Sequence, residues 1–406
     1  MCISILDESV LTRMDFDLTD EIEMLRTNVL AAATNVLAPG ARLGESQGCW
    51  SDEKTKVLSG LGLSTLLIPA TLGGDQDPLA CSVALESLAA GDVGGLLYHD
   101  KPGPFSGALT VLGAVMLNDQ DLPQTKSALA EIVSRWELDF PLGLIESESA
   151  IALAVVSYSC EDLKSIDSSE PISGSLAWSS GRVEDWISST EDKSSLLFIV
   201  GEDFVSLLQA KELSVSPCIA GAFEASGGVS LYWQDLSKSI VVDASRQAAI
   251  YVRSVARLWV ASVLIGIGQA SLDYAIDYGR QRVVFGSAVV DHQANAFDLA
   301  EASVKLEAAR LGLRLGCRNL EMKLDFAGEM SACWLLTQAY CEAREASLRA
   351  TDLSLQLLGG HGYMKDHPVE KWWREARLLV RLFGGEDAAL SDLSTMVLRY
   401  KDPLVL

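Results

Sequence analysis

The chain has 406 residues, of which 49% are hydrophobic and 21% charged, so it is long enough for two or three folded domains and is not intrinsically disordered. Its 55 acidic and 32 basic residues give a formal net charge of −23, which argues against nucleic acid as a partner. Eight cysteines without a C-x-x-C pair, together with four scattered histidines, predict reduced thiols in a cytoplasmic protein and no metal site.

The N-terminal third has a helical pattern from Asp15 to about Trp136. Acidic residues between Asp20 and Glu23 crowd an expected first helical turn, where negative charge suits the helix dipole. Apolar residues then recur on one helical face from Ile22 to Ala32. The first residues lack the basic and then apolar layout of a signal peptide. We therefore expect an N-terminal α-helical domain over residues 1–137.

The pattern shortens between Phe140 and about Ala249, where Gly, Ser, Asp and Pro turns separate β-rich segments. This part predicts a small central β-domain over residues 138–249. The expected strands are Ala150–Tyr158, Ser195–Val200, Val229–Trp233 and Ser239–Val242.

Long helical patterns return from Tyr251 and predict a C-terminal α-helical domain over residues 250–406. The longest apolar runs, such as Trp259–Ile267, are too short for the roughly 20 residues that a bilayer span needs, so no membrane segment is expected. The expected helices are Tyr251–Arg282, Gln293–Met322, Met330–Leu358 and a final segment after Glu386.

Two motifs lie close together near the C-terminus, QLLGGHGY at Gln356–Tyr363 and PVEKWWREAR at Pro368–Arg377. Gly359 and Gly360 permit positive φ and close backbone approach, so a phosphate or a ribose could pack there. The alternative is an ordinary helix C-cap. His361, in the same turn, has a side chain suited to acid/base work, although a solvent-facing structural histidine is an equally simple interpretation.

A third motif, R-x-x-F-G, is formed by Arg282, Phe285 and Gly286, and Gln293 follows at the start of the next expected helix. A guanidinium can donate a bidentate pair to a pyrophosphate, and a phenyl ring offers a flat face for adenine. Ordinary alternatives exist for both residues. An arginine near a helix C-terminus interacts well with the dipole, and a phenylalanine beside glycine is often part of a core.

These three motifs, in the order in which they follow along the chain and with a small β-domain between helical layers, resemble the acyl-CoA dehydrogenase family over nearly the whole chain. The resemblance implies an α+β fold with an N-terminal helical domain, a central β-domain and a C-terminal domain of four-helix-bundle type. It also implies FAD, whose ADP part is held across a subunit interface, and hence a homodimer or homotetramer. The cofactor-binding residues that it implies in this part of the chain are Arg282, Phe285, Gln293, Gln356, Gly359 and Gly360.

The resemblance is weaker in the β-domain, where the flavin ring would bind. The family's L-T-E-P-x-A-G-S-D loop corresponds to residues 144–149, in which isoleucine replaces the threonine and the proline and glycine are absent. Its second flavin contact, W-(I/V)-(T/S), is kept as Trp178, Ser179 and Ser180. By resemblance, Trp178 stacks beside the isoalloxazine and Ser180 bonds toward its N5. In the alternative, Trp178 only fills the face of a sheet.

The family's catalytic glutamate is missing. That residue removes the α-proton of an acyl thioester while the β-hydride passes to the flavin. Its usual place aligns with Phe383, or with Gly384 after a one-residue shift, and its place in a minority of members aligns with Ala256. Arg257 matches the family's arginine at the substrate mouth. Glu386 is the candidate for a relocated base, and the alternative is that it only begins the last helix.

Three functions from different classes stay open. The first is FAD-dependent α,β-oxidation of an acyl thioester, bound to CoA or to an acyl carrier protein, in a specialised biosynthetic pathway. The second is a base-less relative that acts as a flavin monooxygenase or as a non-redox dehydratase or cyclase. The third is an inactive interaction subunit. A local basic patch could dock a carrier protein; its residues are Lys365, Lys371, Arg374 and Arg377. The alternative is that Arg374 and Arg377 pair internally with Glu370 and Glu375.

Overall fold

The computed structural model describes most of the helical parts of the chain and seven strands of its β-region. The described ranges, with isolated residues between them, are 17–48, 60–99, 103–117, 151–157, 174–179, 196–209, 212–218, 221–223, 228–320 and 329–399.

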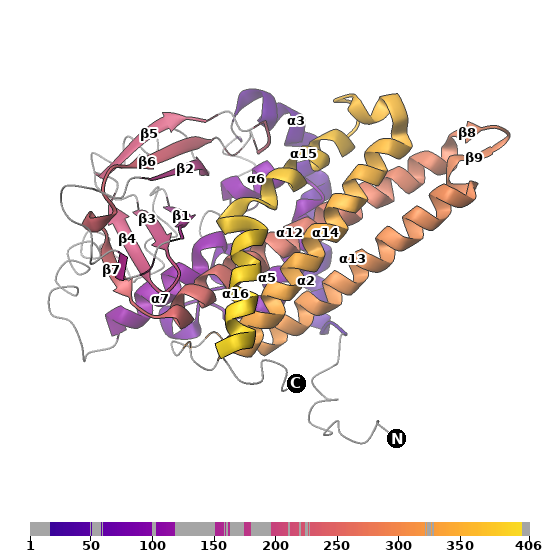
Figure 1. Ribbon diagram of the computed structural model, residues 1–406. Helices are drawn as coiled ribbons and strands as arrows, with labels where there is room; N and C mark the ends of the chain where they lie inside the picture. The colour runs from indigo at the N-terminus through magenta and orange to yellow at the C-terminus, as the bar shows by residue number, and fades with distance from the viewer. Residues whose placement is uncertain are drawn as a thin grey trace, which may run out of the picture.

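The N-terminal helices form one layer of the molecule (Figure 1). The first described helix begins where the sequence predicts, because the side chain of Thr19 accepts a hydrogen bond from the Ile22 N–H and three acidic residues occupy the first turn. A π-helical turn, Ala33–Leu37, joins it to the next helix. The bounds are α2 Asp20–Ala32, α3 Ala38–Gln47, α5 Pro78–Ala89, α6 Val93–His99 and α7 Ser106–Leu117.

Among the residues that the structure describes, the central region contains two sheets with strand orders β1-β3-β4-β7 and β2-β6-β5, and the β1–β3 pair is the parallel one. The expected strands are confirmed within a few residues, and β2, β4 and β5 are additional. Their bounds are β1 Ile151–Val155, β2 Gly174–Ser179, β3 Leu196–Val200, β4 Val205–Gln209, β5 Leu213–Pro217, β6 Val229–Trp233 and β7 Ile240–Asp243.

The larger sheet is buried on both faces. Along β3, Leu197 and Ile199 pack in a core shared with the smaller sheet, whereas Phe198 and Val200 pack in the main core with the helices. This alternation follows from the two-residue period of a strand. The β-domain is therefore fixed against the helical domains through one face of its larger sheet.

The C-terminal region is built around one long buried helix, α12 (Arg246–Gln281), which packs against α14 (Met330–Leu358), α13 (Gln293–Asn319) and α5 (Figure 1). The most apolar window of α12 is long and hydrophobic enough to cross a membrane, but all of it is buried inside the protein, as expected for a core helix. Two shorter helices, α15 (Val369–Leu379) and α16 (Gly385–Arg399), complete the domain. The predicted fold class is confirmed.

A short hairpin connects α12 to α13 and projects from one end of the helices (Figure 1). Its strands are β8 (Val283–Val284) and β9 (Ser287–Ala288). Phe285 and Gly286 form the tip with φ of 53° and 85°. A phenylalanine with positive φ is unusual, because its Cβ crowds the backbone in this region.

Candidate functional site

The glycine turn after α14 forms an open surface. Gly359 ends the helix with φ 59° and ψ −131°, and its N–H bonds to the Gln356 carbonyl, so the C-cap interpretation holds. A Cβ placed on Gly359 or Gly360 would meet no atom within 4 Å. The glycines are therefore not needed to avoid a clash inside the protein at this point. The same turn remains accessible to a ligand that approaches the backbone.

Arg282 and Phe285 lie at the neighbouring end of α12. Arg282 Nη1 donates to Tyr278 Oη at 2.6 Å and to the Leu358 carbonyl at 3.4 Å, which places the guanidinium beside the glycine turn. Phe285 is 97% exposed, so it is not a core residue in this chain. The structure thus brings the arginine and the glycine turn together, and leaves an exposed aromatic ring nearby in sequence.

A surface cavity of about 450 Å³, within the usual size range of ligand pockets, adjoins the turn on the side of α13. Gln356 is part of its wall, whereas Gln293 lies exposed at the first position of α13. Two wall carboxylates are already paired: Asp298 lies 2.8 Å from Arg349, and Asp352 lies 2.7 Å from Arg377. The lining residues are Val289, Asn295, Asp298, Arg349, Asp352, Leu353, Gln356 and Leu357.

Two tyrosine–histidine pairs, which the sequence interpretation missed, lie along the same end of α12. Tyr278 Oη is 2.6 Å from His361 Nδ1, and Tyr274 Oη is 2.8 Å from His367 Nδ1. The two imidazoles stack with centroids 5.5 Å apart and planes 24° apart. A signal was present in the sequence, because Tyr274, Tyr278 and Arg282 are spaced by four residues and so share one helical face.

The predicted flavin-ring contacts lie in the β-domain. Trp178 is in β2, where the register against β6 shifts between Leu176 and Ser179. Such irregularities often redirect side chains near functional sites. The loop at 144–149 and Ser180 lie outside the described residues, as does the side chain of Trp178, so these contacts stay predictions.

The position predicted for the family's glutamate is a strained turn at Phe383. Phe383 has φ 54° and ψ 41°, and Gly384 and Gly385 follow with φ of 86° and 59°. The Phe383 ring packs edge-on to Phe105 at a centroid distance of 6.2 Å. A Cβ on Gly384 would lie 3.0 Å from Val155 Cγ1, so the turn rests on the end of β1. Neither residue aligned with the base can accept a proton.

Glu386 begins α16 together with Asp387, as the helix-start interpretation predicts. Its carboxylate forms a short ion pair with Arg344 of α14, and its side chain is 42% exposed. A base must be free to approach the substrate proton, so this ion pair would have to open first. The role of Glu386 as a relocated base stays a prediction.

Arg257 is buried, with 1% of its surface exposed, and it belongs to a compact charge cluster. Its Nη1 and Arg253 Nη2 each lie 2.7 Å from a carboxylate oxygen of Asp392. Burial lowers the pKa of Arg257 and by itself would raise that of Asp392, but the two guanidinium groups lower the pKa of Asp392 below its ordinary value. Nε and Nη2 of Arg257 have no hydrogen-bond partner among the described residues. Ala256, the other position aligned with the base, is fully buried and has no ionisable group.

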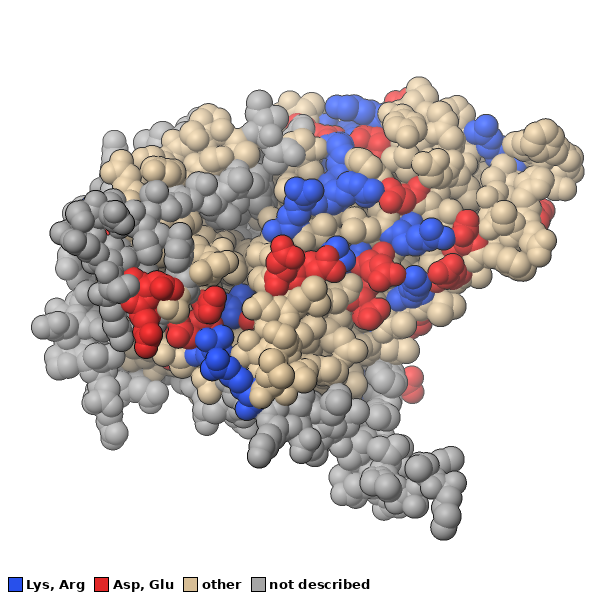
Figure 2. All heavy atoms as spheres, viewed as in Figure 1, with Lys and Arg blue, Asp and Glu red and all other residues tan. Residues whose placement is uncertain are grey.

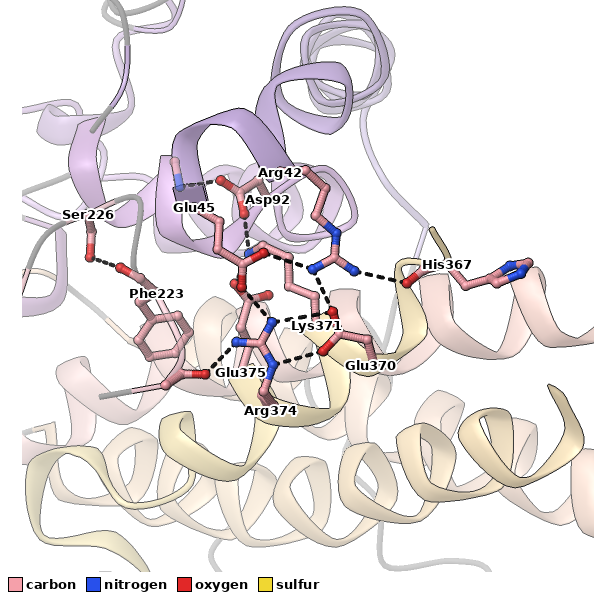
Figure 3. A network of polar contacts seen from close by, with 12 residues as sticks. Arg42, Glu45, Asp92, Phe223, Ser226, His367, Glu370, Lys371, Arg374 and Glu375 are labelled. Carbon is pink, nitrogen blue, oxygen red and sulfur yellow. Dashed lines mark hydrogen bonds and ion pairs between the residues drawn. The ribbon is translucent and has the colours of Figure 1, made fainter. Parts of the chain in front are cut away.

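The basic residues of PVEKWWREAR form internal ion pairs (Figure 3). Lys371 is buried and lies 2.5 Å from Asp92 of the N-terminal domain, and it also pairs with Glu375. Arg374 pairs with Glu370 at 2.9 Å and donates to the Gly221 carbonyl of the β-domain.

A free basic docking patch is therefore not supported at Lys371 or Arg374. Arg377 is also paired, with Asp352 at 2.7 Å rather than with Glu375 as the alternative interpretation had it. Basic and acidic residues alternate over the helical part of the face in Figure 2.

Comparisons with known proteins agree with this architecture. The model of the C-terminal domain of acyl-CoA dehydrogenases matches residues 247–397. A caffeyl-CoA reductase-Etf complex subunit of Acetobacterium woodii is 33% identical over 151 residues, which are 37% of this chain and 38% of that protein. A probable acyl-CoA dehydrogenase of Mycobacterium tuberculosis is 24% identical over 379 residues, covering 89% of this chain and 92% of the relative.

Solved structures show the same fold. Butyryl-CoA dehydrogenase from Megasphaera elsdenii superposes with a TM-score of 0.67 at 19% identity, covering 95% of this chain and all of that one. The glutaryl-coenzyme A complex of glutaryl-coenzyme A dehydrogenase gives 0.63 at 19% identity, covering 94% of this chain and 96% of that one. The matches at 33–35% identity span only about a third of those relatives, 38%, 31% and 30% of their lengths.

Proposed function

We propose that this chain, which is similar to acyl-CoA dehydrogenases in residues 247–397 and in its overall fold, is an FAD-dependent oxidoreductase of an acyl thioester carried by CoA or by an acyl carrier protein. The observation that carries the proposal is the juxtaposition of Arg282 with the open glycine turn at Gly359 and Gly360. A cationic fork beside an unobstructed backbone turn suits a diphosphate. A specialised biosynthetic role is part of the same proposal.

The residues present fit the ADP part of FAD. Arg282 would bind the diphosphate, the exposed ring of Phe285 would contact the adenine, and Gln356 and Gln293 would add hydrogen bonds. Tyr278 restricts the guanidinium by accepting from its Nη1, which lowers the entropy lost when a ligand binds. When bound, FAD supplies the hydride acceptor.

We also propose that the protein is a homodimer or homotetramer. Large apolar side chains are exposed along the hairpin and α13, and exposed apolar surface of this kind is a candidate for contact with another chain. A second copy that covers this face would protect them from water and would enclose a dinucleotide bound at Arg282. The residues and their exposed fractions are Val283 65%, Phe285 97%, Phe297 66% and Val304 69%.

The second candidate function is chemistry on this scaffold that needs no protein carboxylate, such as flavin-dependent oxygenation or a non-redox dehydration or cyclisation. It is favoured because Phe383 has no ionisable group and because Glu386 is held in an ion pair with Arg344. A dehydrogenation substrate with an already acidic α-proton would fit the same observation.

Replacing Arg282 or Gln356 by alanine is expected to lower the flavin content of the purified protein. Losing a hydrogen bond to a charged group costs about 1.5–3 kcal/mol, so FAD should bind about 10-fold to 150-fold more weakly to Arg282→Ala. The absorbance spectrum from about 300 to 600 nm measures the flavin directly. Arg280→Ala is the matched control, because Arg280 is exposed and pairs only with Asp277 among the described residues. Full flavin content in both site variants would contradict the assignment.

The relocated base has its own test, in which acyl thioesters are added anaerobically and bleaching of the flavin is followed. If Glu386 removes the α-proton, Glu386→Gln should slow flavin reduction by about 10²-fold to 10⁴-fold. Arg344→Ala keeps the carboxylate but removes its partner, and should retain fast reduction. Equal reduction rates in Glu386→Gln and in the unmodified protein would exclude Glu386 and favour the chemistry without a protein base.

A further inference from the structure

Three hydrogen-bonding side chains form a chain across the turn where the dinucleotide is proposed to bind. Arg282 Nη1 donates to Tyr278 Oη, and the same oxygen lies 2.6 Å from His361 Nδ1. The phenol and imidazole rings are perpendicular, with centroids 5.9 Å apart. His361 is exposed and lies between the two open glycine positions and Tyr363. This series of hydrogen bonds therefore ends at the surface that faces the proposed ligand.

This geometry couples the charge of His361 to the direction of a hydroxyl group. Arg282 occupies one lone pair of the Tyr278 oxygen. In the neutral tautomer whose ring proton is on Nε2, the hydroxyl donates its proton to Nδ1. In the imidazolium form, Nδ1–H must instead donate to the Tyr278 oxygen. The Tyr278 hydroxyl then points its proton toward another acceptor, such as a bound ligand. Protonation thus adds a positive charge and a donor without moving any heavy atom.

A second imidazole holds the first in place. His367 stacks on His361 and is fixed by Tyr274, and its ring also meets Tyr278 edge-on at 6.0 Å. Positive charges on the imidazoles and on Arg282 repel one another, and a nearby anion offsets this repulsion. A diphosphate, with two negative charges, would offset the repulsion between Arg282 and an imidazolium at His361.

The nearby carboxylates of α12 and α14 already have partners other than His361 and His367. On α12, Asp277 pairs with Arg280 at 3.2 Å, and on α14, Asp352 is held by Arg377 and by the Trp373 N–H. Arg42 of α3 donates to the His367 carbonyl at 3.0 Å and adds positive charge.

Three further residues lie near the two histidines: one basic, one acidic and one aromatic. Lys365 and Asp366 are both exposed in the loop before His367. From α15 the facing ring is Trp372, which meets Tyr274 edge-on and carries no charge.

We propose that His361, positioned by Tyr278 and supported by His367, is an additional binding residue for the diphosphate of the flavin dinucleotide and holds it as an imidazolium. The inference rests on the proposed function, since it concerns the same site. Its consequence is that binding of the dinucleotide takes up a proton, so that affinity rises as the pH falls.

The test is calorimetric titration of the flavin-free protein with FAD in two buffers of different ionisation enthalpy, at pH 7.5 and at several values between 6 and 8.5. The diphosphate of FAD is a diester that does not titrate in this range, so any proton comes from the protein or its solvent. We expect uptake of up to about one proton per site and an affinity that rises by at most about tenfold per pH unit. Riboflavin, which has no phosphate, should show neither effect.

His361→Asn should abolish most of the proton uptake, flatten the pH dependence and weaken FAD binding at pH 6 by about tenfold. Tyr278→Phe keeps the imidazole but removes its positioning hydroxyl, and should weaken binding while retaining the uptake. Tyr363→Phe is the control, because that side chain is 73% exposed in the same turn. A matching thermal unfolding midpoint would show that each variant is folded.

Proton uptake that is absent in the unmodified protein, or unchanged in His361→Asn, would overturn the inference while the flavin proposal stands. Failure of FAD to bind to any of these proteins would overturn both, and the absorbance spectrum would report that failure independently.

Discussion

Replacing Asp392 by asparagine is expected to destabilise the folded protein by about 3–5 kcal/mol, because it leaves two buried guanidinium groups without their shared counter-charge. Arg253 and Arg257 are 4% and 1% exposed, and Asp392 bridges them with both of its carboxylate oxygens. Arg253 also donates to the Gly201 carbonyl at 2.5 Å, so the cluster joins α12, α16 and the β-domain. Urea unfolding at pH 7, followed by circular dichroism, measures the loss.

The pH dependence of this contribution has a definite sign. The pKa of Asp392 is lowered in the folded protein, so the stability that it contributes is present above the unfolded value of about 3.9 and is lost as the pH falls below it. Asp387→Asn is the control, since Asp387 lies exposed on the same helix. A loss for Asp392→Asn no greater than for Asp387→Asn would show that the two arginines are stabilised in another way.

Much of the fold could be predicted from local patterns, and the exceptions have physical reasons. The bounds of α14 and β6 are those expected, because each is a regular apolar pattern between clear turn signals. The edge strand β5 was missed, since its residues are mostly exposed or half-buried and it ends at Pro217, so it lacks the continuous apolar run of a central strand.

The candidate site shows the same division between local and distant information. The i,i+4 pair of Glu370 and Arg374 was foreseen from its spacing. Lys371 also pairs with Asp92, 279 residues away, and no spacing rule relates these two residues. A resemblance placed Arg257 at a substrate mouth, which stays a prediction. Its contact with Asp392, 135 residues later, could not be foreseen from spacing.

The second large effect is expected where α15 meets the N-terminal helices, shown in Figure 3. Lys371 is buried between the carboxylates of Asp92 and Glu375. Burial opposes its charge, but the two carboxylates raise its pKa above the ordinary value. Lys371→Met would leave two buried carboxylates facing each other, and should cost about 3–5 kcal/mol of unfolding free energy at pH 8.

The cost should be smaller at low pH, because one carboxylate can take up a proton. Burial raises the pKa of Glu375 to about 7, against the opposing effect of Lys371. A carboxyl group whose pKa is raised by folding binds more protons in the folded state, so its contribution falls as the pH rises from the unfolded value of about 4.3 toward the raised value in the folded state, and removing Lys371 raises that value further. Urea unfolding of Lys371→Met at pH 5.5 and pH 8 should therefore show the larger loss at pH 8.

The double variant Lys371→Met/Glu375→Gln separates this charge effect from simple loss of packing. Glutamine keeps the shape of Glu375 but carries no charge, so the double variant should recover part of the stability at pH 8 and lose its pH dependence between about 4.3 and 7. Lys365→Met, at an exposed position, should change stability by less than about 0.5 kcal/mol. If Lys371→Met loses the same free energy at both pH values, the joint is held by packing. A loss confined to high pH would instead mean that charge balance at Glu375 determines how firmly α15 is fixed to the N-terminal domain.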